Sequence, residues 1–250
     1  MTAGLMFVND QNVIQVDETF VCLSLVAKGT ATATVGHAQA SSVRIIDIQF
    51  AGRDMPVIAL RLPANRLMAA SHIGTNLSGS TWTFRIAVVN MPGGSALPYT
   101  FDYYIFDRPP QAPASGFVGI VVNDANGSTT FNSQYPPALY KTLAEGTWNA
   151  AAKTYTFDTS RSYAVAITQG IGYVEQETES QDTNGNITFT QSWHPIMDCI
   201  YSTTGGFYLE YGKQCGAGGD GPAPTVSYGI EAGSNTSSDT PIMVFDVTGL

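Results

Sequence analysis

The sequence is poor in charged residues. Only 12% of its 250 residues are Asp, Glu, Lys or Arg, whereas globular proteins usually contain about 25%. This shortage excludes coiled coils and long solvated helices, because their polar faces consist largely of charged side chains. Hydrophobic residues make up 44% of the chain, so a disordered protein is also excluded and a large buried core is expected.

Basic clusters and long apolar runs are also missing. The formal net charge is −9, and no cluster of Lys or Arg occurs, so direct binding to nucleic acid is not expected. No apolar run reaches the roughly 20 residues of a membrane helix. No basic residue precedes Lys28, so we expect no secretory signal, no membrane insertion and synthesis in a cytoplasm.

Cysteine is scarce too, with Cys22, Cys199 and Cys215 as its three occurrences. Three cysteines do not make a disulfide framework. A bond between Cys199 and Cys215 is one alternative, and buried reduced thiols are the favoured one, because cytoplasmic disulfides are rare.

Alternating and β-branched segments occupy most of the chain and predict an all-β fold. Turn signals such as Asn126-Gly127 and Asn184-Gly185 separate them, and their spacing is typical of sandwiches or small barrels. Little helix is expected, with residues 64–71 as its best candidate. The predicted strands cover residues 43–50, 57–62, 81–90, 99–107, 117–123, 153–158, 163–169, 187–191, 206–211 and 241–247.

A proline-rich stretch divides the chain into two parts of different charge. Pro109, Pro110 and Pro113 exclude a helix or a central strand at residues 109–115. Residues 1–114 contain seven basic and seven acidic residues, whereas residues 115–250 contain four and thirteen. We therefore predict two tandem β-sandwich-like modules, residues 1–108 for docking and residues 116–250 for interaction, with a linker between them.

An internal repeat supports this division. Residues 4–18 align without a gap with residues 119–133, so that Phe7 matches Val122 and Val16 matches Phe131. Each copy has the pattern of a β-hairpin with an Asn- and Asp-containing turn. Tandem duplication of a β-module is the simplest explanation, and a chance similarity between two hairpins is the alternative.

The repeated motif resembles a family of phage proteins. Gly4-Leu5-Met6-Phe7-Val8-Asn9 with Val16-Asp17, and the closer match Gly119-Ile120-Val121-Val122-Asn123-Asp124 with Phe131-Asn132-Ser133, are similar to small tail-associated proteins of siphophages, as is Tyr103-Tyr104-Ile105-Phe106-Asp107. The resemblance covers about a sixth of the chain and implies a virion component of the distal tail. It implies no catalytic residue.

Two groups of residues are candidates for interaction. Tyr99, Phe101 and Tyr103 alternate on one face of a predicted strand, which suits either a core or a subunit contact. Glu175, Glu177 and Glu179 alternate on one face of another, which suits a solvated face or a protected edge. Trp193 is a further candidate, because an exposed tryptophan can stack on a sugar ring.

Catalytic, cofactor and metal sites are not predicted. The glutamates could act as paired carboxylates on a glycoside, but no nucleophile motif or phosphate-binding loop accompanies them. His194, Asp198, Cys199 and Cys215 lack the close pairing of zinc ligands.

The sequence therefore predicts a non-enzymatic structural component of a phage tail tip or baseplate. We expect it to assemble with other tail or fibre proteins and to form a homo-oligomer, with a host surface receptor as a further candidate partner. The alternatives are a receptor-binding module for a host glycan or pilus, and a polysaccharide hydrolase.

Overall fold

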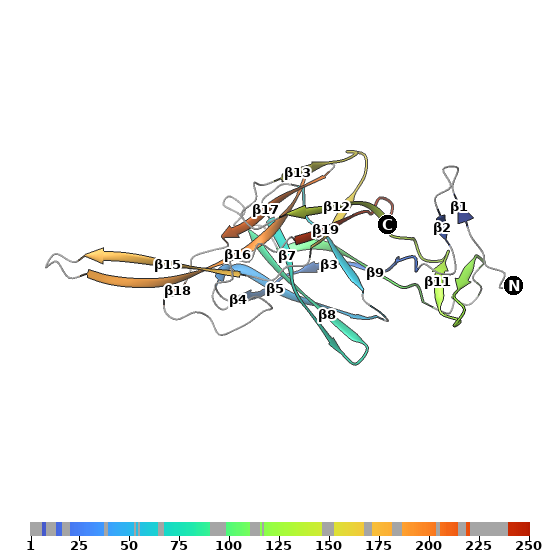
Figure 1. Cartoon of the computed structure of the whole chain (residues 1–250), viewed down its shortest axis with the longest axis horizontal. Helices are drawn as coiled ribbons and strands as arrows, with labels where there is room; N and C mark the ends of the chain where they lie inside the picture. Colours follow the sequence, from blue (N-terminus) through green and yellow to red (C-terminus); the bar gives the residue numbers. More distant parts are fainter. Residues whose placement is uncertain are drawn as a thin grey trace.

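The computed structural model consists of β-strands and loops, and the all-β prediction is confirmed. No helix occurs in the described residues, which are 7–8, 14–16, 21–37, 40–52, 54, 56–64, 68–90, 99–110, 116, 118–146, 153–167, 172–181, 187–203, 206–214, 219–220 and 240–250. Their strands form two large antiparallel sheets and two separate hairpins (Figure 1).

The six-stranded sheet contains strands from both parts of the chain. Its order is β12 (Leu139–Gly146), β19 (Thr240–Asp246), β14 (Tyr163–Ile167), β6 (Val57–Arg61), β9 (Thr100–Asp107) and β3 (Ser24–Thr32). The second half of the chain thus supplies one side of the sheet and the first half supplies the other.

The larger sheet is divided in the same way. Its main path is β13 (Lys153–Thr156), β17 (Gly206–Gln214), β16 (Ile187–Thr203), β7 (Met68–Ser78), β8 (Thr81–Asn90), β5 (Ala40–Ala51) and β4 (Val35–His37). Two further strands, β15 (Gly172–Gln181) and β18 (Gly219–Asp220), pair with β16 away from this path.

The two small hairpins confirm the internal repeat. β1 (Phe7–Val8) pairs with β2 (Ile14–Val16), and β10 (Val121–Asn123) pairs with β11 (Thr129–Asn132). The pairs Phe7↔Val16 and Val8↔Ile14, moved by 115 residues, become Val122↔Phe131 and Asn123↔Thr129, with the same register shift between them. The sequence alignment therefore matches structurally equivalent residues.

The repeat continues into the sheets. The seven pairs from Ser24↔Asp107 to Ala31↔Phe101 correspond to the seven from Leu139↔Asp246 to Gly146↔Thr240. Both series contain a bulge at the same place, at Val26 and at Lys141, which are also 115 residues apart. Since bulges are specific features of a fold and not random defects, the two halves share one architecture.

The remaining strands follow the same correspondence. In each half, β3 or β12 forms the outer edge of the six-stranded sheet, and β9 or β19 lies next to it. The third strand, β6 or β14, lies where the two halves meet. In the larger sheet, the tight hairpin of β7 and β8 corresponds to that of β16 and β17, with Ser78↔Thr81 equivalent to Thr203↔Gly206.

The halves are fused where equivalent strands meet. β6 pairs with β14 through Leu60↔Val165, and β7 pairs with β16 through Ala70↔Ile200. Both sheets therefore cross the boundary predicted at residues 109–115, and the strands of the two halves are not separate sheets on either side of a linker. They form one continuous two-sheet structure with an approximate two-fold axis.

The outer edges of the six-stranded sheet also meet, at one end. Ser24 bridges to Pro137, Leu25 N donates to Pro136 O at 2.8 Å, and Ala138 N donates to Leu23 O at 2.7 Å. Leu23 and Ala138 are again 115 residues apart, as expected for residues that face each other across a two-fold axis. This closure pairs part of two strand edges that would otherwise be open to other chains.

A hydrophobic core shared by both halves lies against one face of this six-stranded sheet. Phe106 of β9 and Phe245 of β19 are both at most 2% exposed, and their rings stack with centroids 4.5 Å apart. Ala59, Ala164 and Ala166 leave room for these rings. Each phenylalanine comes from the equivalent position of one half, so this core holds the halves together.

Two more cores lie between the sheets, one in each half. The first half buries Ile58, Leu60 and Phe101 against Phe84 and Ile86. The second buries Val165 and Val244 against Ile200 and Phe207. β6, β9, β14 and β19 thus have apolar residues on both faces, as strands covered on both sides require.

The helix expected at residues 64–71 is absent where the structure describes this segment. Met68–Ser78 is strand β7, and Met68, Ala69 and Ala70 are each at most 1% exposed. Short apolar runs without flanking polar residues suit a buried strand as well as a helix. Asn126-Gly127 forms the predicted turn, with a φ of 80° at Gly127, whereas Asn184-Gly185 lies outside the described residues.

The stacked phenylalanines give a stability prediction. We expect Phe106→Leu and Phe245→Leu each to lower the free energy of unfolding by about 1–2 kcal/mol, with a coupling of about 0.5–1.5 kcal/mol between them. Urea unfolding of the single and double variants measures both quantities. The control pair Phe101→Leu and Phe245→Leu lies in different cores and should be additive. Additivity of Phe106→Leu and Phe245→Leu would contradict a shared core.

Candidate functional site

The largest departure from the repeat is a long hairpin of β15 and β16 in the second half. In the first half, residues 62–67 alone connect β6 to β7. In the second half the corresponding connection, from β14 to Trp193, contains β15 and the first part of β16. This arm extends away from the sheets at the end opposite to the β1–β2 hairpin (Figure 1). Insertions into a repeated scaffold commonly carry the function of one copy.

The register of the arm defines its two faces. Glu175, Glu177 and Glu179 lie opposite Trp193, Gln191 and Phe189, and directly opposite residues of an antiparallel pair share a face. Between them lie the pairs Gln176↔Ser192, Thr178↔Thr190 and Ser180↔Thr188, which belong to the other face. By register, the positions of one face are Glu, Trp, Gln and Phe, and those of the other face are Gln, Ser and Thr.

The arm is also strongly acidic. No Lys or Arg occurs between Arg161 and Lys213, whereas the arm contains the three glutamates and Asp182. Such a one-signed segment attracts cationic groups and repels acidic ones. The register places two of the separately predicted candidates, Glu175 and Trp193, opposite each other, with Glu177 and Glu179 farther along β15.

A second insertion lies beside the arm. Residues 215–239 follow β17, whereas residues 91–99 suffice after β8. Within this longer connection, β18 pairs with β16 through Ser192↔Asp220 and Trp193↔Gly219. Trp193 therefore lies on the central strand of three, between Glu175 of β15 and Gly219 of β18. The sequence showed the glycine-rich segment but not this neighbourhood, because the pairing joins distant residues.

The other predicted residues lie in and beside the core of the first half. Phe101 is 2% exposed and belongs to the core between the sheets, and Tyr99 and Tyr103 are partly buried against it. Tyr103 lies opposite Gly29, where an added Cβ would be 2.7 Å from the tyrosine hydroxyl. Phe101 is thus a core residue. The three aromatics belong to β9 and the residue before it, whereas the glutamates belong to β15.

Titratable groups elsewhere have structural partners. His72 is 6% exposed, its Nε2 lies 2.9 Å from Gly74 O and 2.8 Å from Thr75 Oγ1, and its ring packs edge-on against Phe84. Burial lowers its pKa more than the Gly74 carbonyl raises it, so His72 is neutral. In the part of the chain that the structure describes, no group of three His, Cys, Asp or Glu residues is arranged to hold a metal ion. No helix there is long and apolar enough to cross a membrane.

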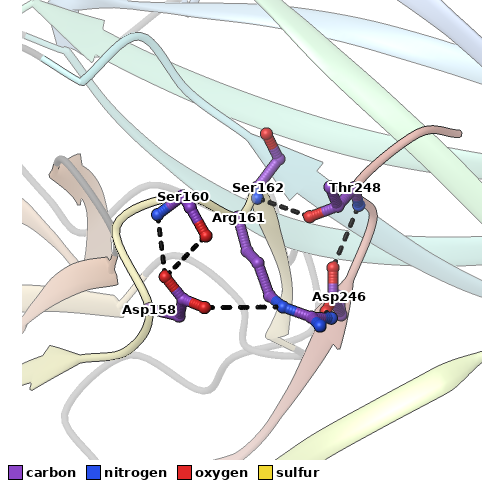
Figure 2. A network of polar contacts seen from close by, with 6 residues as sticks. All are labelled: Asp158, Ser160, Arg161, Ser162, Asp246 and Thr248. Carbon is purple, nitrogen blue, oxygen red and sulfur yellow. Dashed lines mark hydrogen bonds and ion pairs between the residues drawn. The ribbon is translucent and has the colours of Figure 1, made fainter.

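A polar network fixes the strand from which the arm begins. Arg161, before β14, donates from Nη1 to Asp246 Oδ2 at the end of β19, at 2.5 Å (Figure 2). Thr248 N donates to Asp246 Oδ1 at 3.0 Å, and Ser162 N donates to Thr248 Oγ1 at 2.8 Å. Asp158 accepts bonds from Ser160 N and Oγ, which close the turn between β13 and β14. The network therefore anchors the start of β14, the strand that precedes the arm.

The first half has a corresponding ion pair with its charges reversed. There Asp54, in the loop before β6, lies 2.7 Å from Nε of Arg108, which directly follows β9. The loop thus supplies the acid in one half and the base in the other.

Comparison with known proteins finds no matching family model, no matching curated protein and no matching solved structure.

Asp246 gives a prediction for the pH dependence of stability. Burial alone would raise its pKa, but the bonds from Thr248 and Arg161 and the guanidinium charge outweigh burial, so its pKa is lowered. Its stabilising effect is therefore present above the unfolded pKa of about 3.9 and is lost as the pH falls through the lower folded pKa. We expect Asp246→Asn to lower the free energy of unfolding at pH 7 by about 1–3 kcal/mol and to flatten its acid dependence.

Urea unfolding between pH 7 and pH 2 provides the measurement. The control is Asp102→Asn, which removes an exposed pair with Arg61 whose side chains are 42% and 43% exposed. This change should cost less than about 1 kcal/mol. A wild-type pH profile for Asp246→Asn would refute the assignment.

Proposed function

We propose that this protein is a non-enzymatic structural component of a phage tail tip or baseplate, which connects tail proteins and fibres or contacts the host. The observation that carries the proposal is the single arm of β15 and β16, inserted into one half of a duplicated scaffold. The resemblance of both repeated hairpins to tail-associated proteins supports the phage context. In this proposal the near-neutral first half docks into the particle and the acidic second half makes the outward contact.

The scaffold suits such a role mechanically. Hydrophobic cores and two continuous sheets hold the described part of the scaffold together, and the Arg161–Asp246 pair anchors the start of β14, the strand that precedes the arm. The arm itself offers two sheet faces and a ten-pair antiparallel ladder. In this proposal the two-sheet scaffold binds one neighbouring tail protein, and the arm holds a second protein at a defined position relative to the first.

Replacement of the arm tests the proposal. The variant carries residues 62–67 in place of residues 169–192, because this short connection joins the equivalent strands of the first half. We expect the purified variant to unfold cooperatively, whereas phage particles that carry it adsorb to host cells at least tenfold less or lack a distal tail component. Adsorption assays and negative-stain images measure these effects.

The matched control lengthens the turn at Gly79 by two residues. This turn joins β7 to β8 and belongs to the scaffold, not to the arm. Particles with the control change should remain complete and infectious. Complete, fully infectious particles with the arm variant would overturn the proposal.

A second candidate function is recognition of a host glycan or pilus. The specific observation is the pairing of Glu175 with Trp193 on one face of the arm, in line with Glu177, Gln191, Glu179 and Phe189. Aromatic rings stack on the apolar faces of sugars, and carboxylates accept hydrogen bonds from their hydroxyls. The same carboxylates would bind lysines of a protein receptor.

Purified full-length protein on an array of bacterial surface glycans tests this candidate. We expect Trp193→Ala to reduce binding at least tenfold and Thr190→Ala, on the opposite face, to leave it unchanged. Equal binding by both variants, or no binding by the wild type to any glycan or purified pilus, would end this candidate.

A further inference from the structure

The turn between β10 and β11 holds an exposed Asn-Gly pair in a fixed conformation. Asn126 and Gly127 are both exposed, and Gly127 has a φ of 80°, which glycine adopts without strain. Gly127 N donates to Asp124 O at 3.0 Å, which closes a β-turn from Asp124 to Gly127. The pair is therefore open to water, while its main chain is held by the turn.

The side chain of Asp124 holds the main chain on both sides of this pair. Its Oδ1 accepts hydrogen bonds from Asn126 N and from Ser128 N, each at 2.8 Å. The main chain of Asp124 contributes as well, because its N–H donates to Ser128 O at 2.8 Å and its carbonyl accepts the bond from Gly127 N. One residue thus fixes the segment from Asn126 to Ser128.

An asparagine followed by glycine can modify itself, because glycine has no side chain to hinder attack on the asparagine amide. The nitrogen of Gly127 attacks Cγ of Asn126, and a bond forms between these two atoms. The bond from Cγ to the side-chain nitrogen breaks, and ammonia leaves with the proton of the Gly127 amide. Water then opens the cyclic imide at either carbonyl, which gives aspartate or isoaspartate.

The closed turn opposes the first step of this reaction. The Gly127 nitrogen becomes a nucleophile only after it loses the proton that it donates to Asp124 O. It must also turn toward the side chain of Asn126, whose own N–H and that of Ser128 are bound to Asp124 Oδ1. The rate of the reaction therefore depends on how often the turn opens.

We propose that Asn126 is a site of spontaneous covalent modification, where the chain converts to isoaspartate when the β10–β11 turn opens. Asp124 is the positioning residue that keeps this conversion slow. The site goes beyond the tail-tip role and does not depend on it.

The conversion has a consequence for the contact between the halves. Isoaspartate routes the main chain through the side chain and lengthens it by one carbon, which disturbs the spacing of the two N–H groups that Asp124 Oδ1 binds. Strand β11 follows directly, and its Thr130 O accepts a hydrogen bond from Cys22 N of the first half at 2.9 Å. Modification of Asn126 thus weakens a contact between the two halves.

Incubation of the purified full-length chain in mildly alkaline buffer tests the site. Peptide mass spectrometry with fragment-ion sequencing measures conversion at Asn126 separately from that at Asn184, which also precedes a glycine. We expect Asp124→Ala to raise the rate at Asn126 about tenfold, because hydrogen bonds to a charged acceptor are strong. Wild-type protein unfolded in urea should likewise convert about tenfold faster than folded protein.

The other copy of the repeat supplies two matched variants. It has Asn9 at the place of Asp124 and Gln11 at the place of Asn126. Asp124→Asn keeps an acceptor oxygen and should restore most of the protection that Asp124→Ala loses. Asn126→Gln should abolish the conversion at this site.

Ser133→Ala is the control for general weakening of the hairpin. It removes the bond from Ile120 N to Ser133 Oγ, 2.9 Å long, at the end of the hairpin away from the turn, and should leave the rate unchanged. Equal acceleration by Ser133→Ala and Asp124→Ala, or an equal rise at Asn184, would overturn the role of Asp124. Equal rates in folded and urea-unfolded wild type would do so even where Asp124→Ala does not fold, and no isoaspartate at Asn126 under either condition would overturn the site itself.

Discussion

The stacking of Phe106 on Phe245 is the contact on which the two-fold arrangement depends. The two rings occupy equivalent positions in β9 and β19, and both lie in the core that the six-stranded sheet encloses. Within each sheet the two halves are joined through one residue pair, Leu60↔Val165 or Ala70↔Ile200. Because these joins are short, the shared apolar core adds substantially to the cohesion between the halves.

The shared core also buries two carboxylates that require hydrogen-bond donors. Asp107 and Asp246 follow the two phenylalanines and are 2% and 7% exposed. Each ends a strand beside the joined edges, so each requires hydrogen-bond donors at that depth. Asp246 receives them from Arg161 and Thr248, and Asp107 receives one from Arg108 N.

Local patterns were enough to predict the strands and the repeated hairpins, but not how the halves combine. Runs of β-branched and aromatic residues were enough to predict β8 and β9, although β9 is buried on both faces from Tyr104 to Asp107. The gapless alignment of residues 4–18 with 119–133 identified equivalent residues of the hairpins. Beyond them the equivalence changes from 115 residues in β3 and β12 to 139 in β9 and β19, because the connections differ in length. Strand β7 was missed because its first six residues, Met68–Ile73, are all buried and so show no alternation between a buried and an exposed face.

The candidate arm was predictable only where its pattern is local in the sequence. The alternation of Glu175, Glu177 and Glu179 is local and could be read directly. Their pairing with Trp193, Gln191 and Phe189, and the place of β18 beside Trp193, depend on residues far apart in the chain. That the arm is an insertion becomes evident only when β14 and β16 are compared with β6 and β7.

The arm also makes an otherwise nearly symmetric scaffold asymmetric. The equivalent strands of the two halves are related by the two-fold axis, whereas in the described residues β15 belongs to the second half alone. The arm therefore gives each chain one defined direction that the two-fold arrangement of its sheets would not give.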